Sequence, residues 1–425
     1  MTNYPQLFRL RQQFEGPVVD DVAGEVEQQL ASLALAEKIQ PGQSVAITAG
    51  SRGIANIEII IRGICQHLTA LGAEPFIVPA MGSHGGGTAA GQQQIIESYG
   101  ITEEFCGCPI RASMDTVVVC EAEEGFPVHF DQQASEADHV FVCGRVKPHT
   151  GFHGDIESGL MKMMLIGLGK HAGALIYHRA IMNYSFGQIV RSVAREVLAK
   201  CRIVGGLAIV ENAYDETAKL AGVAPEKFEE EEKGLLVLAK QWMPRLPFDQ
   251  VDILTIDEIG KNISGSGLDT NVVGRKYLDH RAAEEEYPKV KKIIVRGLTA
   301  ETHGNAAGIG LAEFCLSRVV EQMNVQATRV NCLTGGHPTG AMIPLDYETD
   351  RETLDMALST IGLIKPLESR LMWIRDTLDV AEVECSAAYM EEAQQRADLE
   401  VLTPLRDMPF DADGNLPDVQ ALAQI

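Results

Sequence analysis

Residues 45–87 read VAITAGSRGIANIEIIIRGICQHLTALGAEPFIVPAMGSHGGG and decide the fold class. The run 45–50 is short and apolar and ends in a Gly-Ser turn, as a buried strand does. Residues 56–71 place their isoleucines at the spacing of one helical face, and residues 75–79 form a second apolar run. A strand, an amphipathic helix and a strand in this order predict a βαβ unit with parallel strands.

The same alternation continues along the chain. Residues 117–120 and 139–143 read as further strands, and residues 186–245 read as a helix-rich stretch. Strands at 251–256 and 292–296, with helices at 311–323 and 367–378, indicate a second α/β region. We therefore expect an α/β protein with two Rossmann-like α/β domains and a cleft between them.

The expected domain boundaries follow from this pattern. Residues 1–250 would form an N-terminal α/β domain that carries the chemistry, and residues 251–400 a C-terminal α/β domain that closes the cleft. The last segment, 401–425, contains Pro404, Pro409 and Pro417. We expect this tail to pack back on the N-terminal domain.

Composition limits the classes of partner. The chain has 425 residues and a net charge of -23, with 36 basic and 59 acidic residues. Binding to nucleic acid or to an anionic membrane needs a surplus of lysine and arginine, so neither partner is expected. There is no apolar run long enough for a membrane span and no signal-peptide pattern, and the nine cysteines are scattered. These features favour a cytoplasmic protein with reduced thiols.

Four side chains with useful chemistry stand in unusual local motifs: His84 in a Gly-Ser-His-Gly turn, His149 after Pro148, Lys162 in an apolar run, and His178. Imidazoles offer acid–base chemistry near neutral pH or a metal ligand, and a lysine offers covalent chemistry. Arg52, His84 and His149 each follow a predicted strand. Functional residues of α/β sheets gather at the carboxyl ends of strands, so we expect these three in one crevice.

Other features of the sequence keep two alternatives open. Residues 167–172, Gly-Leu-Gly-Lys-His-Ala, fit the dinucleotide fingerprint, and residues 163–166 before them could be a strand. No acid follows at the distance where a ribose-binding acid is expected, which weakens an NAD-dependent dehydrogenase. A non-catalytic protein that binds a metal or an anion is the second alternative. The acidic run 229–232 is best explained as a solvated helix face.

The ordered motifs resemble the nickel-pincer lactate racemase family and its hydroxyacid racemase and epimerase relatives. That family has, in this order, a Thr-Arg turn, a Gly-Thr-His turn, a Pro-His motif, a Gly-Gly-x-Lys segment and a later histidine. The corresponding segments here are Ser51-Arg52, Gly82-Ser83-His84, Pro148-His149, residues 158–162 ending in Lys162, and His178. The interval from Lys162 to His178 is 16 residues, which is similar to the family's interval.

The resemblance implies an isomerase that inverts C2 of a 2-hydroxy acid by proton-coupled hydride transfer. Lys162 would carry the nickel-pincer nucleotide (pyridinium-3-thioamide-5-thiocarboxylic acid mononucleotide with Ni(II)) through a covalent link, and His178 would ligate the nickel. His84 and His149 would be the two general bases, and Arg52 would bind the substrate carboxylate. The implied partners are the 2-hydroxy acid and the proteins that make the pincer cofactor.

Departures from the family pattern point to the substrate. His149 and Lys162 are 13 residues apart, a longer interval than in lactate racemase. The added residues include His153 and Glu157, which we expect to contact the substrate. Gly85 to Gly87 replace bulkier residues after the first histidine. A roomier and more polar pocket favours a sugar acid such as gluconate.

Two polar, glycine-rich segments in the second α/β region complete the candidate site. Residues 257–267 contain Lys261 and residues 302–310 contain Asn305, and each segment follows a predicted strand. The family places residues that contact substrate and cofactor in this region. Lys261 and Asn305 are therefore candidate cofactor-binding residues.

Overall fold

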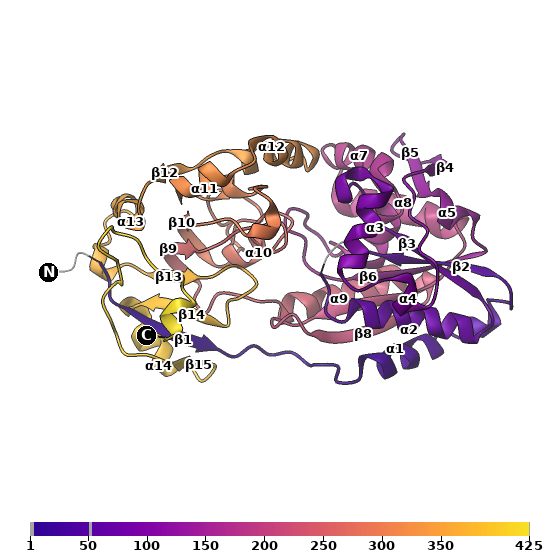
Figure 1. The fold of residues 1–425 in the computed structure, drawn as a ribbon, viewed down its shortest axis with the longest axis horizontal. Helices are drawn as coiled ribbons and strands as arrows, with labels where there is room; N and C mark the ends of the chain where they lie inside the picture. Colours follow the sequence, from indigo (N-terminus) through magenta and orange to yellow (C-terminus); the bar gives the residue numbers. More distant parts are fainter. Residues whose placement is uncertain (1–3, 51–52, 425) are drawn as a thin grey trace. The chain divides into compact units, whose positions relative to one another are not determined.

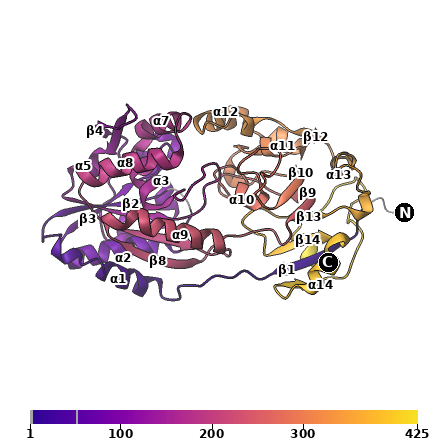
Figure 2. The ribbon, with the colours of Figure 1, turned by 180° about the vertical axis from the view of Figure 1, so that it is seen from behind.

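The computed structural model describes residues 4–50 and 53–424, which form two compact units. The N-terminal unit is Gly16–Met243, and the C-terminal unit joins the residues from Pro244 onward with those before Gly16 (Figures 1 and 2). The α/β fold class is confirmed. The sequence predicted that residues 1–250 form the N-terminal domain, but the described residues before Gly16 belong to the C-terminal unit, because the strand formed by residues 7–12 pairs with strands of that unit.

A five-stranded sheet is the centre of the N-terminal unit, in the order β3 (Glu74–Pro79), β2 (Ser44–Ala49), β6 (His139–Arg145), β7 (Ile203–Glu211) and β8 (Thr217–Val223). The first four strands are parallel and β8 is antiparallel. The predicted βαβ unit is confirmed, since α2 (Ile57–Ala70) connects the neighbouring strands β2 and β3.

Helices cover both faces of this sheet. Val45 and Ile47 of β2 pack with the apolar side chains of α1 (Val22–Ala31) and α2, whereas Ala46 between them packs in a second core on the opposite face. That second core includes α6 (Gly159–Lys162), α8 (Phe186–Lys200) and α9 (Phe228–Trp242). A sheet buried on both faces lacks a polar side, which explains its continuous apolar runs.

Strands β7 and β8 lie inside the stretch that the sequence predicted to be rich in helix. Every residue of β7 except Glu211 is buried. A strand of this kind shows no alternation of apolar and polar residues, so its pattern resembles that of a buried helix segment. The prediction was therefore wrong for residues 203–211 and 217–223.

Shorter elements complete the N-terminal unit. They are η1 (Leu35–Glu37), η2 (Gly85–Gly87), α3 (Ala89–Ser98), α4 (Glu103–Cys106), β4 (Thr116–Glu121), β5 (Pro127–Asp131), α5 (Gln132–Glu136), the π-helical turn η3 (Met163–Gly167), α7 (Lys170–Ile181) and η4 (Pro225–Lys227). Strands β4 and β5 form a separate antiparallel ribbon.

The C-terminal unit contains an eight-stranded mixed sheet in the order β12-β11-β10-β9-β13-β14-β1-β15. The parallel strands are β9 (Gln250–Ile256), β10 (Lys289–Val295), β11 (Phe314–Leu316), β12 (Leu345–Tyr347) and β13 (Leu371–Ile374). The antiparallel part is β14 (Glu382–Ser386), β1 (Leu7–Gln12) and β15 (Leu399–Val401). The helices are α10 (Thr270–Val273), α11 (Ser317–Gln322), α12 (Val325–Thr334), α13 (Asp350–Ser359) and α14 (Met390–Gln395).

The helix predicted at residues 367–378 is instead the buried strand β13, which pairs with β9 and β14. Its four residues, LMWI, are all buried. Pro366, just before this segment, opens a short 3-10 turn that precedes the strand. Pairing on both sides overrides the local helical pattern.

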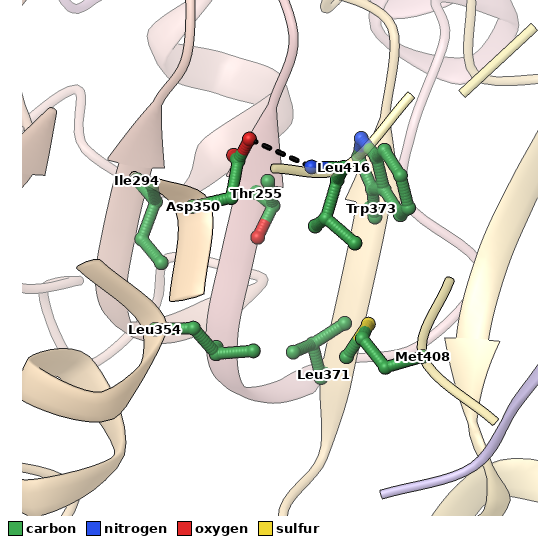
Figure 3. Close-up of a pocket in the computed structure, with 8 residues that line it drawn as sticks. All are labelled: Thr255, Ile294, Asp350, Leu354, Leu371, Trp373, Met408 and Leu416. Atoms are coloured by element: carbon green, nitrogen blue, oxygen red, sulfur yellow. Dashed lines mark hydrogen bonds between the residues drawn. The ribbon is translucent and has the colours of Figure 1, made fainter. Parts of the chain in front are cut away.

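The described part of the tail packs on the C-terminal unit, so the prediction that it returns to the N-terminal domain was wrong. Figure 3 shows Met408 and Leu416 lining a small, largely apolar pocket beside Trp373. The Leu416 N–H donates to the Asp350 carboxylate at 3.0 Å, and the Leu416 carbonyl accepts from Arg296 Nη2 at 2.7 Å. Arg296 is only 1% exposed, and the tail carbonyls satisfy donors that would otherwise be buried unpaired.

A buried ion pair joins three elements of the N-terminal unit. Lys170, the first residue of α7, places its Nζ 2.8 Å from Asp131 Oδ2 and donates to the Pro79 carbonyl at 2.5 Å. Both side chains are fully buried. Asp131 Oδ1 also accepts the Ala134 N–H that starts α5. The pair therefore holds the start of α7 against the ends of β3 and β5.

Replacing Lys170 with methionine should lower the free energy of unfolding by about 3–5 kcal/mol, because the Asp131 carboxylate would stay buried without its cation. Urea denaturation followed by circular dichroism measures the change. Lys200→Met is the matched control, because its ion pair with Glu196 is exposed and should contribute little. An unchanged unfolding curve for Lys170→Met would show that the buried pair is dispensable.

Candidate active site

His84 and His149 follow parallel strands of the same sheet, as the sequence predicted. His84 lies in the turn after β3, His149 lies in the loop after β6, and β2 runs between the two strands. The carboxyl ends of parallel strands lie at one edge of the sheet, so both loops start from that edge. Arg52 follows β2 but lies outside the described residues, so its role stays a prediction.

A buried glutamine holds the backbone of the His84 turn. Gln92 of α3 is fully buried, and its Nε2 donates to the Gly82 carbonyl at 2.9 Å and to the His84 carbonyl at 3.3 Å. Gly85 has φ +65, and a Cβ atom there would lie 2.6 Å from the Gln92 backbone nitrogen. The turn thus requires glycine at this position.

The imidazole of His149 is fixed by its own loop. Its Nδ1 accepts the N–H groups of Gly151 at 3.0 Å and Phe152 at 3.1 Å. In the neutral ring the proton therefore resides on Nε2, so that atom is a hydrogen-bond donor. The His149 N–H donates to Glu157 Oε2 at 2.9 Å, and Glu157 Oε1 pairs with Lys240 at 2.7 Å.

Glu157 was predicted to bind substrate. Its residue is only 2% exposed, and both carboxylate oxygens have partners within the chain. These contacts favour a role in positioning His149 over contact with a substrate. His153, the other predicted substrate contact, is exposed in the same loop, and its role stays a prediction.

An aromatic stack brings His149, Lys162 and His178 together. The His149 ring stacks on Phe152 at 4.0 Å between centroids, and Phe152 stacks on Phe186 at 4.4 Å. Lys162 Nζ lies 5.6 Å from the Phe152 centroid, and the His178 ring lies 6.2 Å from the same centroid. Three of the four motifs singled out in the sequence therefore meet at Phe152.

Lys162 ends α6 and is followed at once by the π-helical turn η3. Such turns occur frequently at functional sites. A Cβ atom at Gly144, near the end of β6, would lie 2.7 Å from Met163 Cγ, so the turn packs closely on the strand that leads to His149. Lys162 itself is half-buried.

His178 lies on α7 and is half-buried. Burial lowers the pKa of its imidazole, and the nearby Lys162 ammonium lowers that pKa further. The ring is therefore neutral near pH 7, which leaves a lone pair for a metal ion. Among residues 4–50 and 53–424, no group of three or more His, Cys, Asp or Glu side chains could hold a metal ion.

Sequence reasoning missed several residues of this site. Phe152 and Phe186 form its aromatic centre, yet single phenylalanines carry no motif. Glu232 was assigned to a solvated helix face, but it is only 1% exposed, and its carboxyl group accepts the Met161 N–H. The one available signal was the helical period of α9, which places Glu232 on the same side as the buried Leu235, Leu236 and Ala239.

Lys261 and Asn305 lie in the C-terminal unit, after β9 and β10. Lys261 Nζ donates to the Asn331 side chain at 2.6 Å and to the Gly265 carbonyl. Asn305 Oδ1 accepts the Ala307 N–H at 3.1 Å. Both side chains thus form hydrogen bonds within their own unit, and their cofactor-binding role stays a prediction.

The structural context does not favour the dinucleotide fingerprint at residues 167–172. The residues before it form the π-helical turn η3, where the fingerprint needs a strand. Lys170, in the middle of the segment, is fully buried in the pair with Asp131.

In the described part of the chain, no helix is long and apolar enough to cross a membrane.

A family model matches part of the N-terminal half of the chain. Residues 10–187 match the model of the lactate racemase N-terminal domain. A comparison with curated proteins found no match.

Two solved structures share the fold. The lactate racemase apoprotein from Thermoanaerobacterium thermosaccharolyticum is 15% identical with a TM-score of 0.52, and the match covers 87% of this chain and 94% of that chain. A protein from Thermotoga maritima is 12% identical with a TM-score of 0.52, and the match covers 86% of this chain and 98% of that chain. At these identities the likeness concerns the fold alone.

The pKa of His178 should lie below its usual value of 6.5, because both burial and Lys162 disfavour the imidazolium. Lys162→Met removes a cation, so the pKa should rise but remain below 6.5, since burial is the larger cause. Histidine-labelled NMR titration measures both values. Lys227→Met, which removes an exposed cation paired with Glu230, should leave the His178 pKa unchanged. A wild-type pKa at or above 6.5 would contradict the assignment.

Proposed function

We propose that this chain is an isomerase that racemises or epimerises a 2-hydroxy acid at C2, because residues 10–187 match the model of the lactate racemase N-terminal domain. The observation that supports this most is the meeting of His149, Lys162 and His178 around Phe152, within the matched residues. Two imidazoles and an amine in one cluster suit such chemistry.

The residues around Lys162 fit a nickel-pincer nucleotide. Lys162 offers an amine for the covalent link, and the ring faces of Phe152 and Phe186 lie within 6.0 Å of that amine. His178 offers a neutral imidazole, and nickel is well served by imidazole together with soft sulfur donors from the cofactor. When bound, the cofactor would supply the hydride acceptor that no side chain provides.

His84 and His149 would transfer the proton of the substrate hydroxyl group. Inversion of a carbon that bears a hydroxyl group needs a proton-transfer group on each face. His149 presents Nε2–H in its neutral form and so would first donate a hydrogen bond to a substrate oxygen; it would transfer a proton only from its imidazolium form. His84, on the turn after β3, would begin as the acceptor. Arg52 would bind the substrate carboxylate.

A polyhydroxy acid such as gluconate is the substrate that the loops favour. A Cβ atom added at Gly86, two residues after His84, would meet no atom within 4 Å. Of the polar residues added between His149 and Lys162, Asp155 pairs with Arg191 and Glu157 pairs with Lys240. His153 would then supply the added polarity beside the substrate.

The cofactor assignment is tested by intact-protein mass after co-expression with the pincer biosynthesis proteins. Wild-type protein should gain the mass of the nucleotide with nickel, and Lys162→Ala should not. Lys227→Ala, which changes an exposed lysine, is the control and should load normally. An unmodified wild type, while a known pincer enzyme loads in the same cells, would refute the cofactor assignment and favour a plain metal or anion site.

The acid–base assignment is tested by the rate of inversion at C2, followed by NMR with gluconate and lactate. His84→Asn and His149→Asn should each lower kcat by about 10²–10⁴, the usual contribution of a positioned proton-transfer group. His67→Asn is the control: His67 lies on α2 and pairs with Glu27, so this variant should retain activity. Faster inversion of lactate than of gluconate would contradict the proposed substrate class.

A further inference from the structure

Helix α9 carries one carboxyl group that differs from its neighbours. Glu229 pairs with Lys233 and Arg191, Glu230 pairs with Lys227, and Glu231 is exposed. Glu232 alone is buried, in the core between α9 and the sheet. A buried carboxyl group must find hydrogen-bond donors, or the protein loses stability.

The donors for Glu232 are backbone N–H groups at the start of α6. The Met161 N–H lies 3.1 Å from Glu232 Oε1 and 3.3 Å from Oε2. Burial raises the pKa of Glu232 to about 8, and hydrogen bonds from the N–H groups of Met161 and Leu160 oppose that rise. The Glu232 carboxyl group therefore accepts hydrogen bonds from the first turn of α6, the helix that ends in Lys162.

The usual cap of α6 is not available for this purpose. The N-cap residue is Ser158, and its side chain makes no capping hydrogen bond. The Ser158 hydroxyl instead donates to the Lys147 carbonyl at 2.6 Å and accepts the Lys147 N–H at 2.7 Å. Ser158 thus holds the loop that leads to His149. The N–H groups at the start of α6, which have no partner within the helix, donate to Glu232 instead.

Gly159 makes room for this arrangement. It has φ +83, and a Cβ atom there would lie 2.2 Å from Glu232 Oε1. Only glycine allows the carboxyl group to approach the backbone this closely. Lys162 is three residues further along the same helix, and residues at this spacing are neighbours on one face.

We propose that Glu232 is the positioning residue of Lys162: by accepting the N–H groups of the first turn of α6, it fixes the turn that presents the Lys162 amine to Phe152 and Phe186. The importance of that amine rests on the proposed function, in which Lys162 carries the cofactor. The position of the amine is a property of the apoprotein, so it can be tested without cofactor.

The experiment measures how fast individual lysines of the apoprotein react with acetic anhydride, by peptide mass spectrometry. Lys162 is compared with the exposed Lys219 in the same sample. The fully buried Lys170 reports whether the N-terminal unit stays folded. The variants are Glu232→Ala, Glu232→Asp and Glu232→Gln, and Glu231→Gln on the exposed side of α9 is the matched control.

Glu232→Ala and Glu232→Asp remove or withdraw the acceptor, so Lys162 should react at least about threefold faster relative to Lys219, as expected for the loss of one hydrogen bond. Glu232→Gln keeps an acceptor of the same length and should stay within about twofold of the wild type. Glu231→Gln should change nothing, and Lys170 should stay unreacted. In cells that make the cofactor, loading of Lys162 should fall in the same order.

Unchanged Lys162 reactivity in both Glu232→Ala and Glu232→Asp would overturn the proposal. So would a Glu232→Gln variant that shifts as far as Glu232→Ala, because acceptance of the N–H groups would then not be the cause. If Lys170 becomes reactive in the alanine variant, the aspartate and glutamine pair decides the question. A wild type that never loads cofactor would refute the proposed function and leave the apoprotein result standing.

Discussion

The buried pair of Lys170 and Asp131 is the interaction on which the arrangement of the candidate site depends. It ties the first residue of α7 to the Pro79 carbonyl at the end of β3. The turn after β3 carries His84, and α7 carries His178. Two candidate residues that are far apart in the sequence are therefore anchored through one charge pair, which has little freedom because neither partner contacts water.

A common design supports the other candidate residues. Gln92 holds the carbonyls around His84, Glu157 holds the His149 N–H, and Glu232 holds the N–H groups ahead of Lys162. In each case a buried polar side chain forms a hydrogen bond with the backbone at or near the candidate residue, and not with that residue's side chain. Backbone anchoring of this kind fixes the origin of a side chain, and an active site needs its groups placed within fractions of an ångström.

The sequence predicted best where chemistry and periodicity are local. The strand and helix pattern of residues 45–79 was confirmed as β2, α2 and β3, because each element has a distinct apolar period. The sequence also singled out His149, Lys162 and His178 as separate motifs, and the structure places their side chains around Phe152. Residues 203–211 and 371–374 were misassigned, because short buried runs look the same in a strand and in a helix.

The support of the site was beyond sequence reasoning for a different reason. A glutamate in an acidic run is exposed in most helices, and three of the four acids at 229–232 do make surface ion pairs or face solvent. Glu232 departs from that rule: it lies on the buried side of α9, accepts the Met161 N–H, and approaches Gly159, which is distant in the sequence and has no side chain in its way. The sequence around Gly159 and the sequence around Glu232 do not indicate that the two residues meet, and only the fold brings them into contact.

The match to the lactate racemase N-terminal domain ends at residue 187, so some residues of the candidate site lie inside the match and others lie after it. The residues with candidate chemical roles in the N-terminal unit, from Arg52 to His178, all lie before that point. Glu232 and Lys240, which bond to α6 and to Glu157, lie after it on α9. The motifs therefore supply the chemical groups, and α9 supplies part of the rigidity that those groups need. A chain that kept the motifs but lost α9 would keep the candidate residues and lose the contacts from Glu232 and Lys240 that help to hold them in place.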